Sequence, residues 1–295
     1  MTEWRFVTLD VFTATRFGGN QLAVFPDARG LTDAQMQSLA AELNLSETTF
    51  VLPPASPANT ARVRIFNRVA EMPFAGHPNV GTGFVLAEHA KDGLLRFEEI
   101  AGLVEVAIER DAAGAVSGAE IGAPQPLSTG PKMDPALLAG CVGLAEGDVM
   151  TAAHWPVMAS VGNSFVIAEV TSEALSRAKP DLTRFAEAAL AFPHLGPRRL
   201  PLYLYAKNGP GRLRARMFSP LSGTIEDAAT GSAATPLAAM LLALGTRKTL
   251  SVEITQGAEM GRPSLLRASA FRARDGVRAK VAGSCVPVFE GKFRL

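Results

Sequence analysis

The chain has 295 residues, of which 47% are hydrophobic and 19% are charged, a composition typical of a globular protein rather than a disordered one. This length is more than one hydrophobic core usually organises, and it suits two lobes. Lys and Arg number 29 and Asp and Glu number 28. Because phosphate binding needs a concentrated excess of basic side chains, we expect no nucleic acid partner.

The N-terminus and the cysteines favour a cytoplasmic location. Residues 1–7 have no basic stretch that leads into an apolar core, as a signal peptide would. The strongest apolar run, residues 236–244, is roughly half as long as a bilayer span requires, so no membrane partner is expected. Cys141 and Cys285 are distant from each other, and two such thiols predict neither a disulfide framework nor a metal site.

The first part of the chain alternates predicted strands with one well-marked helix. Residues 7–11 alternate as a strand does, and a Gly-Gly-Asn turn leads into a second strand at 22–25. Thr32 and Gln35 form a capping box for a helix that Asn44 should end. Further strands are expected at 48–52, 62–66, 94–108 and 116–121, and a helix is expected over 78–88, with Pro78 in its first turn.

The same order of landmarks returns beyond a Pro-rich stretch at 123–134, which is the best candidate for a linker. A strand, Gly-Asn turn and strand recur at 157–168, followed by a helix-rich stretch at 172–190. A strand at 202–205, an Arg-rich strand at 212–218 and a glycine-rich turn with an apolar helix at 229–244 then follow. Four landmarks in one order predict an internal duplication. We expect an α+β fold of two similar lobes, with residues 1–125 completed by 283–295 as the first and residues 131–282 as the second.

The two repeated helices, 78–88 and 234–244, are apolar on most faces. Each should therefore lie buried, with a mixed β-sheet or barrel wrapped around it. The start of a buried helix presents backbone N–H groups and the positive end of the helix dipole, and glycines there let a ligand approach closely. Two such starts facing each other across a cleft would bind a substrate carboxylate. The alternative is that Gly76, Gly231 and Ser232 only cap and pack the helices.

Ionisable side chains stand beside both glycine-rich turns. Glu71 and His77 flank the first turn, Glu226 and Asp227 precede the second, and Glu47 stands just ahead of an apolar strand. Apolar neighbours raise the pKa of a carboxyl group, as a general acid or base at neutral pH requires. Each residue also has an ordinary explanation. Glu47 could be a solvated residue at a strand start, His77 a helix cap and Asp227 a loop carboxylate, with Glu226 equally able to be the functional acid of its pair.

Five segments carry a resemblance to a known family: 19–25, 45–50, 74–82, 226–233 and 257–264. Together they resemble the phenazine-biosynthesis PhzF-like family, to which the Gly-His-Pro and Asp-x-Ala-Thr-Gly-Ser strings are fairly specific. The resemblance runs from about residue 6 to the C-terminus. It implies the fold of diaminopimelate epimerase, in which two related lobes each curl a mixed sheet around a central helix.

The resemblance also implies a function, a cofactor-independent isomerase that moves a proton on a small, carboxylate-bearing and possibly cyclic metabolite. The namesake reaction moves a hydrogen within the ring of 2,3-dihydro-3-hydroxyanthranilate without metal or organic cofactor, and by analogy the protein is a homodimer. Glu47 is the implied acid/base. The implied catalytic residues are Glu47, His77 and Asp227, and the implied substrate-binding residues are Gly76, Gly231, Ser232, Arg262 and Ser264.

The chain departs from its relatives at several of these positions. Gln21 and Ala228 stand where the family often has proline. Epimerases of this fold use a cysteine at each helix start, where this chain has Ala75 and Thr230. A two-thiol epimerase mechanism is therefore excluded. The remaining alternatives are a catalytically idle ligand-binding or protein-interaction member of the fold, and an epimerase of another kind.

Other conspicuous side chains have simpler interpretations. The arginines that alternate along residues 62–64 and 212–216 indicate a solvated strand face, with carboxylate binding as a lesser alternative. Trp4 and Trp155 are expected in a core or between the lobes. His89, His154 and His194 are too scattered to build a metal site and are expected at the surface or in packing contacts.

Overall fold

The computed structural model describes residues 2–294, which divide into two compact units. Unit 1 takes the described residues up to Pro124 and those from Val281 onward, and unit 2 takes Gln125–Lys280. The sequence predicts that the first lobe ends at residue 125, that the second lobe spans residues 131–282, and that residues 283–295 return to the first lobe. Strand β18 (Gly276–Arg294) carries the chain from unit 2 back to unit 1.

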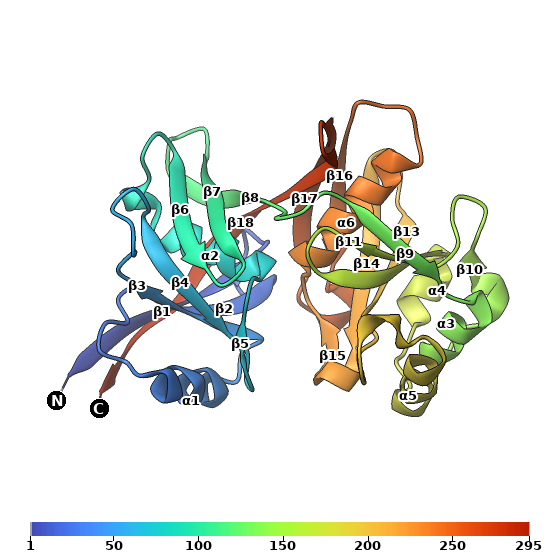
Figure 1. Ribbon diagram of the computed structural model, residues 1–295, viewed down its shortest axis with the longest axis horizontal. Coiled ribbons are helices and arrows are strands. Elements are labelled where there is room, and N and C mark those ends of the chain that lie inside the picture. Colours follow the sequence, from blue (N-terminus) through green and yellow to red (C-terminus); the bar gives the residue numbers. More distant parts are fainter. Residues whose placement is uncertain (1, 295) are drawn as a thin grey trace. The chain divides into compact units, whose positions relative to one another are not determined.

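Unit 1 is a closed barrel of eight strands. Its ladder runs β18, β1, β2, β3, β4, β6, β7, β8 and back to β18, with parallel pairs at β2–β3 and β4–β6 and the short β5 beside β4. Its strands are β1 (Glu3–Val11), β2 (Asn20–Phe25), β3 (Glu47–Leu52), β4 (Ala61–Phe66), β5 (Glu71–Met72), β6 (Leu94–Glu99), β7 (Gly102–Arg110) and β8 (Val116–Gly122) (Figure 1).

Helix α2 (Gly76–Val85) fills this barrel, in contact with β1, β2, β3, β7 and β8, and a short 3-10 turn, η1 (Ala87–His89), follows it. Residues 76–83 are all buried. Gly81 and Gly83 make the fit possible, because a Cβ atom at Gly81 would lie 2.5 Å from Leu22 and one at Gly83 would lie 2.5 Å from Val106. The expected buried helix inside a wrapped sheet is confirmed in this unit.

Helix α1 (Asp33–Leu43) lies outside the barrel, where Met36, Leu39 and Ala40 are buried on one face. Thr32 and Gln35 form the expected capping box, and Asn44 ends the helix in the left-handed conformation. These local signals predicted both ends of the helix correctly.

Unit 2 repeats the pairing order of unit 1. Antiparallel β11–β12, parallel β12–β13, antiparallel β13–β14 and β14–β15, parallel β14–β16 and antiparallel β16–β17 follow one another, as the pairs from β1 to β7 do in unit 1. The strands are β9 (Ser128–Lys132), β10 (Val149–Met150), β11 (Val157–Ser160), β12 (Ser164–Val170), β13 (Leu202–Lys207), β14 (Arg212–Ser219), β15 (Thr224–Asp227), β16 (Thr249–Gln256) and β17 (Ser264–Ala273).

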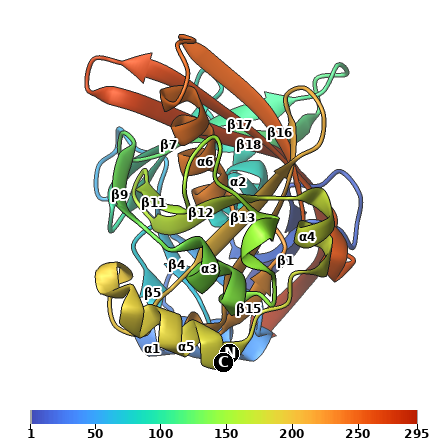
Figure 2. The same cartoon turned by 90° about the vertical axis from the view of Figure 1, so that its right-hand side faces the viewer.

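Helix α6 (Gly231–Ala243) has the place in unit 2 that α2 has in unit 1, in contact with β11, β12, β16 and β17 (Figure 2). It begins earlier than the expected 234, so Pro236 lies inside the helix. Three further helices lie beside the strands: α3 (Pro135–Cys141), α4 (Ser172–Arg177) and α5 (Leu182–Ala191), with 3-10 turns η2 (Glu146–Asp148), η3 (Pro193–Leu195), η4 (Pro220–Ser222) and η5 (Ala258–Met260).

The structure corrects two sequence-based expectations about this unit in part. The stretch 123–134 is no plain linker, since it contains β9, which pairs with β11, and Asp134, which caps α3. Trp155 is not a core residue, because 47% of it is exposed, whereas Trp4 is packed in the core of unit 1. Short paired strands escape sequence patterns when their partner is distant along the chain.

The alternating arginines are not all solvated, which corrects a third expectation. Arg64 on β4 forms two hydrogen bonds with Glu71 on β5, of 2.7 and 2.6 Å. Arg216 on β14 forms the matching pair with Glu226 on β15, of 2.7 and 2.8 Å. Each guanidinium also lies over the phenylalanine two residues later. The same ion pair therefore joins equivalent strands in both units.

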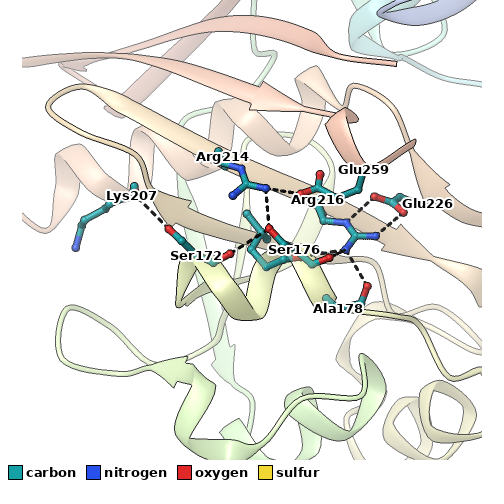
Figure 3. Close-up of polar contacts among 9 residues, drawn as sticks. Ser172, Ser176, Ala178, Lys207, Arg214, Arg216, Glu226 and Glu259 are labelled. Carbon is teal, nitrogen blue, oxygen red and sulfur yellow. Dashed lines mark hydrogen bonds and ion pairs between the residues drawn. The ribbon is translucent and has the colours of Figure 1, made fainter. Parts of the chain in front are cut away.

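Figure 3 shows how Arg216 is used in unit 2. Besides Glu226, its Nη1 donates to the carbonyls of Leu175 and Ala178 at the end of α4, at 3.0 and 2.8 Å. Only 6% of Arg216 is exposed. Helix α4 packs against β14, and the guanidinium of Arg216 donates to the carbonyl groups at the end of this helix instead of to water.

Candidate active site

Glu47 is the first residue of β3, where it pairs in parallel register with Leu22 of β2. Its side chain is 17% exposed. Burial raises the pKa of this carboxyl to about 7, against a hydrogen bond from Ser46 and the charge of Arg68, which both lower it. Glu47 is thus not the solvated strand-start residue that its position alone suggested.

His77 meets Glu47 from the start of α2, as its second residue. Its Nε2 lies 3.3 Å from Glu47 Oε2, and only 6% of the imidazole is exposed. On the other side of the ring, Nδ1 lies 3.5 Å from Asn20 Nδ2. Ser46 Oγ donates to Asn20 Oδ1 at 3.0 Å, which turns the amide nitrogen of Asn20 toward the imidazole. Since an amide nitrogen only donates, this arrangement favours the tautomer with its hydrogen on Nε2, facing Glu47.

The start of α2 has no side-chain cap. Ala75 precedes the helix in an extended conformation and offers no acceptor, and Gly76 is the first helical residue. The positive end of the helix dipole therefore lies beside His77 without a carboxylate or hydroxyl of the capping position to neutralise it. The first two residues of α2, Gly76 and His77, thus lie beside Glu47 within unit 1.

Asp227 belongs to a second polar cluster, within unit 2. It is the last residue of β15, and its Oδ2 accepts a hydrogen bond of 2.6 Å from Thr230 Oγ1. Gln256 Nε2 donates to Thr230 Oγ1 at 3.0 Å and to the Asp227 carbonyl at 2.9 Å. Tyr203 donates to Gln256 Oε1 at 3.1 Å, and both side chains are buried. This chain of bonds fixes the Thr230 hydroxyl on Asp227.

The start of α6 matches the start of α2. Thr230 stands before the helix without capping it, because its hydroxyl is committed to Asp227. Gly231 is the first helical residue and Ser232 the second, the positions that Gly76 and His77 hold in α2. Gly231 is buried and Ser232 is half-buried. The two equivalent helix starts thus carry the predicted binding residues, and that they face each other across a cleft stays a prediction.

Ser264 and Arg262 lie on the segment that approaches this helix start. Ser264 is buried, and its hydroxyl contacts the carbonyls of Ala228 and Arg262 at 2.9 and 3.2 Å. Gly257 makes the close approach possible, since a Cβ there would lie 2.5 Å from the same two carbonyl oxygens. Ser264 therefore anchors the loop before α6, and Arg262 is half-buried beside it.

The structure separates the two acids that the sequence left equivalent. Glu226 accepts hydrogen bonds from Arg216 with both carboxylate oxygens. Asp227, the next residue of β15, instead accepts a hydrogen bond from Thr230 beside the helix start. Glu71 is likewise committed to Arg64. Sequence reasoning did not assign roles to Asn20, Ser46, Thr230, Gln256 or Tyr203. The Gly-Asn turn contains Asn20 and the string that begins at Gly257 follows Gln256, but neither reveals their contacts.

Neither cysteine lies at a helix start. Cys141 is the last residue of α3 and Cys285 lies on β18, and both are free and buried. Burial raises the pKa of the Cys141 thiol to about 12 and that of the Cys285 thiol further still. Thiols in this state are poor nucleophiles and poor bases, which agrees with the exclusion of a two-thiol mechanism.

Comparison with known proteins decides the family. The model of the family described as phenazine biosynthesis-like protein (PhzC-PhzF) matches residues 9–291. The chain belongs to this family. It is 38% identical to the trans-2,3-dihydro-3-hydroxyanthranilate isomerase of Pseudomonas fluorescens, over 98% of this chain and 99% of that protein. Its relatives are named isomerases, and the chain is accordingly an isomerase of the PhzF family.

Solved structures place the fold in the same group. A PhzF-family protein of Bacillus anthracis has a TM-score of 0.87 and 24% identity, with all of both chains covered. A hydroxyproline epimerase of Agrobacterium vitis has a TM-score of 0.62 and 12% identity, covering 98% of this chain and 92% of its own. The mixed α/β architecture with its barrel is therefore a fold that this chain shares with both proteins.

Two features are missing among residues 2–294. No helix among them is long and apolar enough to cross a bilayer. No group of three or more His, Cys, Asp or Glu side chains among them could hold a metal ion.

Proposed function

We propose that this protein is a cofactor-independent isomerase in which Glu47 moves a proton between two carbons of a small carboxylate-bearing metabolite. Glu47 as the carboxylate would take a proton from an activated carbon, and as the acid it would return the proton to another carbon of the same substrate. Atoms and charge balance within the substrate, so no oxidant, reductant or second substrate is required.

The observation that carries this proposal is the buried Glu47 carboxyl beside His77. A pKa of about 7 makes the acid and the carboxylate comparably populated at neutral pH, which suits a group that must act in both forms. His77, with Nε2 at 3.3 Å, is placed to hold the carboxylate in one orientation and to stabilise its charge. The uncapped start of α2 at Gly76 supplies backbone N–H groups for charge that develops on the substrate.

The unit 2 residues are assigned to substrate binding and support. Gly231 and Ser232 open α6 with N–H and hydroxyl donors that suit a carboxylate, and Asp227 is held by Thr230 beside them. Arg262 is a further cation for substrate charge, and Ser264 keeps the loop before α6 in place. Ser232→Ala should therefore raise KM more than it lowers kcat.

The choice of substrate rests on the relatives. The Pseudomonas fluorescens relative is named trans-2,3-dihydro-3-hydroxyanthranilate isomerase, and that compound is the first member of the panel to test. Related cyclic and linear amino acids complete the panel, since the helix starts recognise the carboxylate rather than the ring. A homodimer is proposed by the same family analogy, and a cytoplasmic location is proposed from the two free cysteines.

Turnover of this panel by matched variants tests the role of Glu47. Glu47→Gln should lower kcat/KM about 100-fold or more, because a general acid–base contributes on that order, whereas Glu42→Gln, on the exposed side of α1, should match the wild type. Equal turnover by Glu47→Gln would remove Glu47 from the mechanism. Wild-type binding without turnover of any member would favour the idle-binder alternative, and inversion of a single stereocentre would favour an epimerase.

A further inference from the structure

A second buried carboxyl group lies in unit 1, outside the proposed catalytic set. Glu99 is the last residue of β6, and both of its carboxyl oxygens are buried without a hydrogen-bond partner. The neighbouring Glu98 points elsewhere, since it accepts bonds from the backbone of Ala55 and Ser56 and from Asn59. A buried carboxylate without donors is costly, so the state of Glu99 needs a physical account.

The side chain that meets Glu99 is Asn79, on the first turn of the catalytic helix α2. Asn79 is fully buried, and its Nδ2 donates to the Ala75 carbonyl at 3.0 Å. Its Oδ1 is buried without a partner, as are the two oxygens of Glu99. Burial raises the pKa of Glu99 to about 8, and the Asn79 amide, near enough to donate to the ionised carboxylate, opposes that rise only in part. At neutral pH the neutral acid is therefore the main form of Glu99.

Three acceptor oxygens meet here, and a single proton would supply their missing donor. We propose that Glu99 is kept as a neutral carboxylic acid that donates to Asn79 Oδ1, so that Asn79 holds the Ala75 carbonyl and fixes the first turn of α2. Glu99 is then a positioning residue for Gly76 and His77, which lie in that turn. What the turn does in catalysis rests on the proposed function, but the proton and its structural effect do not.

The other groups around Glu99 leave this proton in place. Its ladder partner on β7 is Gly102, which has no side chain. On α2 the facing group is Asn79, while His77 is turned to Glu47. On β6 itself Glu98 is bound as the carboxylate, since its three donors lower its pKa. Among residues 2–294, burial raises and Asn79 lowers the pKa of Glu99, and no charged side chain acts on it.

The pH dependence of stability follows from the raised pKa. In the unfolded chain Glu99 titrates near the ordinary value of 4.5, and in the folded protein near 8. The folded state therefore binds the extra proton between these values, and its stabilising effect is lost as pH rises through that window. Glu99→Gln keeps a donor for Asn79 Oδ1 at every pH, so this variant should not lose stability from this source.

The test compares the thermal unfolding midpoint and the amide exchange of α2 in wild type and Glu99→Gln from pH 4.5 to pH 9.5. The unfolding midpoints of the two proteins should be equal at the lowest pH. By pH 8 the midpoint of the wild type should lie several degrees below that of Glu99→Gln, and the difference should then stay constant. Exchange protection of residues 79–82, whose N–H groups make the first intrahelical hydrogen bonds of α2, should weaken in the wild type over the same range. Parallel curves at every pH would overturn the proposal.

Two further variants separate this effect from general damage. Glu98→Gln should open no gap toward high pH, because the pKa of Glu98 is lowered and its stabilisation is instead lost as pH falls. The double variant Asn79→Leu with Glu99→Leu removes the acid and its acceptor together, and it should show the same pH-independent behaviour as Glu99→Gln. A double variant that kept the wild-type pH dependence would assign it to another group. None of these measurements needs a substrate, so their outcome is independent of whether the isomerase proposal holds.

Discussion

The chemistry of Glu47 depends on the single position at which β3 begins. One residue earlier, Ser46 lies at the edge of the strand and donates a hydrogen bond, and one residue later Thr48 is fully buried. Glu47 therefore lies at the boundary between the exposed and the buried part of the strand. There the Ser46 hydroxyl is near enough to donate to its carboxylate, while burial raises its pKa. The balance of burial against one donor and one distant cation sets its protonation.

Removal of the Ser46 donor should change this balance in a known direction. The Ser46 hydroxyl has one hydrogen, and when this turns from Asn20 Oδ1 to Glu47 it stabilises the carboxylate, so Ser46→Ala should raise the pKa of Glu47 above its value of about 7. The acidic limb of the kcat/KM profile should then move to higher pH, with the plateau less affected. A profile with an unchanged acidic limb would show that Ser46 does not tune Glu47. The exposed Ser38→Ala change on α1 is a suitable control.

At the level of elements, the ion pairs Arg64–Glu71 and Arg216–Glu226 join β4 to β5 and β14 to β15. Both acids lie on the short strand that leads toward the start of a barrel-enclosed or equivalent helix, β5 ahead of Gly76 and β15 ahead of Gly231. In unit 2 the pair is the more buried one, with 7% of Arg216 and 14% of Glu226 side chains exposed. The Arg216–Glu226 pair fixes β15 at the residue directly before Asp227.

Loss of one partner of this pair should destabilise the protein strongly. Arg216→Met leaves Glu226 buried and unpaired, which should cost on the order of 3–5 kcal/mol in the free energy of unfolding. The exposed pair Arg212–Glu253, at 3.6 Å, gives the matched control, because Arg212→Met should cost about 1 kcal/mol or less. Urea unfolding measures both. Similar losses for the two variants would contradict a structural role for the buried pair.

The elements also show what the sequence can and cannot predict. The ends of α1 were predictable because the signals, Thr32, Gln35 and Asn44, act within a few residues. The burial of Arg216 was not predictable, because alternation along β14 shows only that Arg216 lies on the opposite face of the sheet from the residues next to it in the strand. Which face is covered depends on α4, about 40 residues earlier in the chain. The choice between Glu226 and Asp227 required the same long-range information.

At the scale of the whole molecule, the two units share one order of strand pairing and one type of helix start. The resemblance predicted the family and the helix enclosed by the barrel of unit 1, whereas the internal duplication indicated by the recurring landmarks stays a prediction. The positions of Glu47 and His77 were predictable only through the resemblance, since they are 30 residues apart and meet through the parallel pairing of β2 and β3 around α2. The polar chain behind Asp227, from Tyr203 to Gln256, carried no signal in the sequence that we could recognise.

The absence of a reactive thiol pair is a property of the whole chain and can be measured directly. Both cysteines are buried with raised pKa, so a thiol reagent such as dithionitrobenzoate should leave the native protein unmodified and label two thiols after denaturation. Rapid modification of the native protein with loss of activity would reopen the thiol epimerase mechanism.

The most direct test of the central claim, that Glu47 carries the proton, is isomerisation in heavy water. Wild type and Glu47→Gln are incubated with trans-2,3-dihydro-3-hydroxyanthranilate, and deuterium is located in the product by NMR. The wild type should place deuterium at the carbon that receives the proton, to the extent that Glu47 exchanges with solvent during turnover, and Glu47→Gln should place none. Equal deuterium incorporation by the two proteins would contradict the claim.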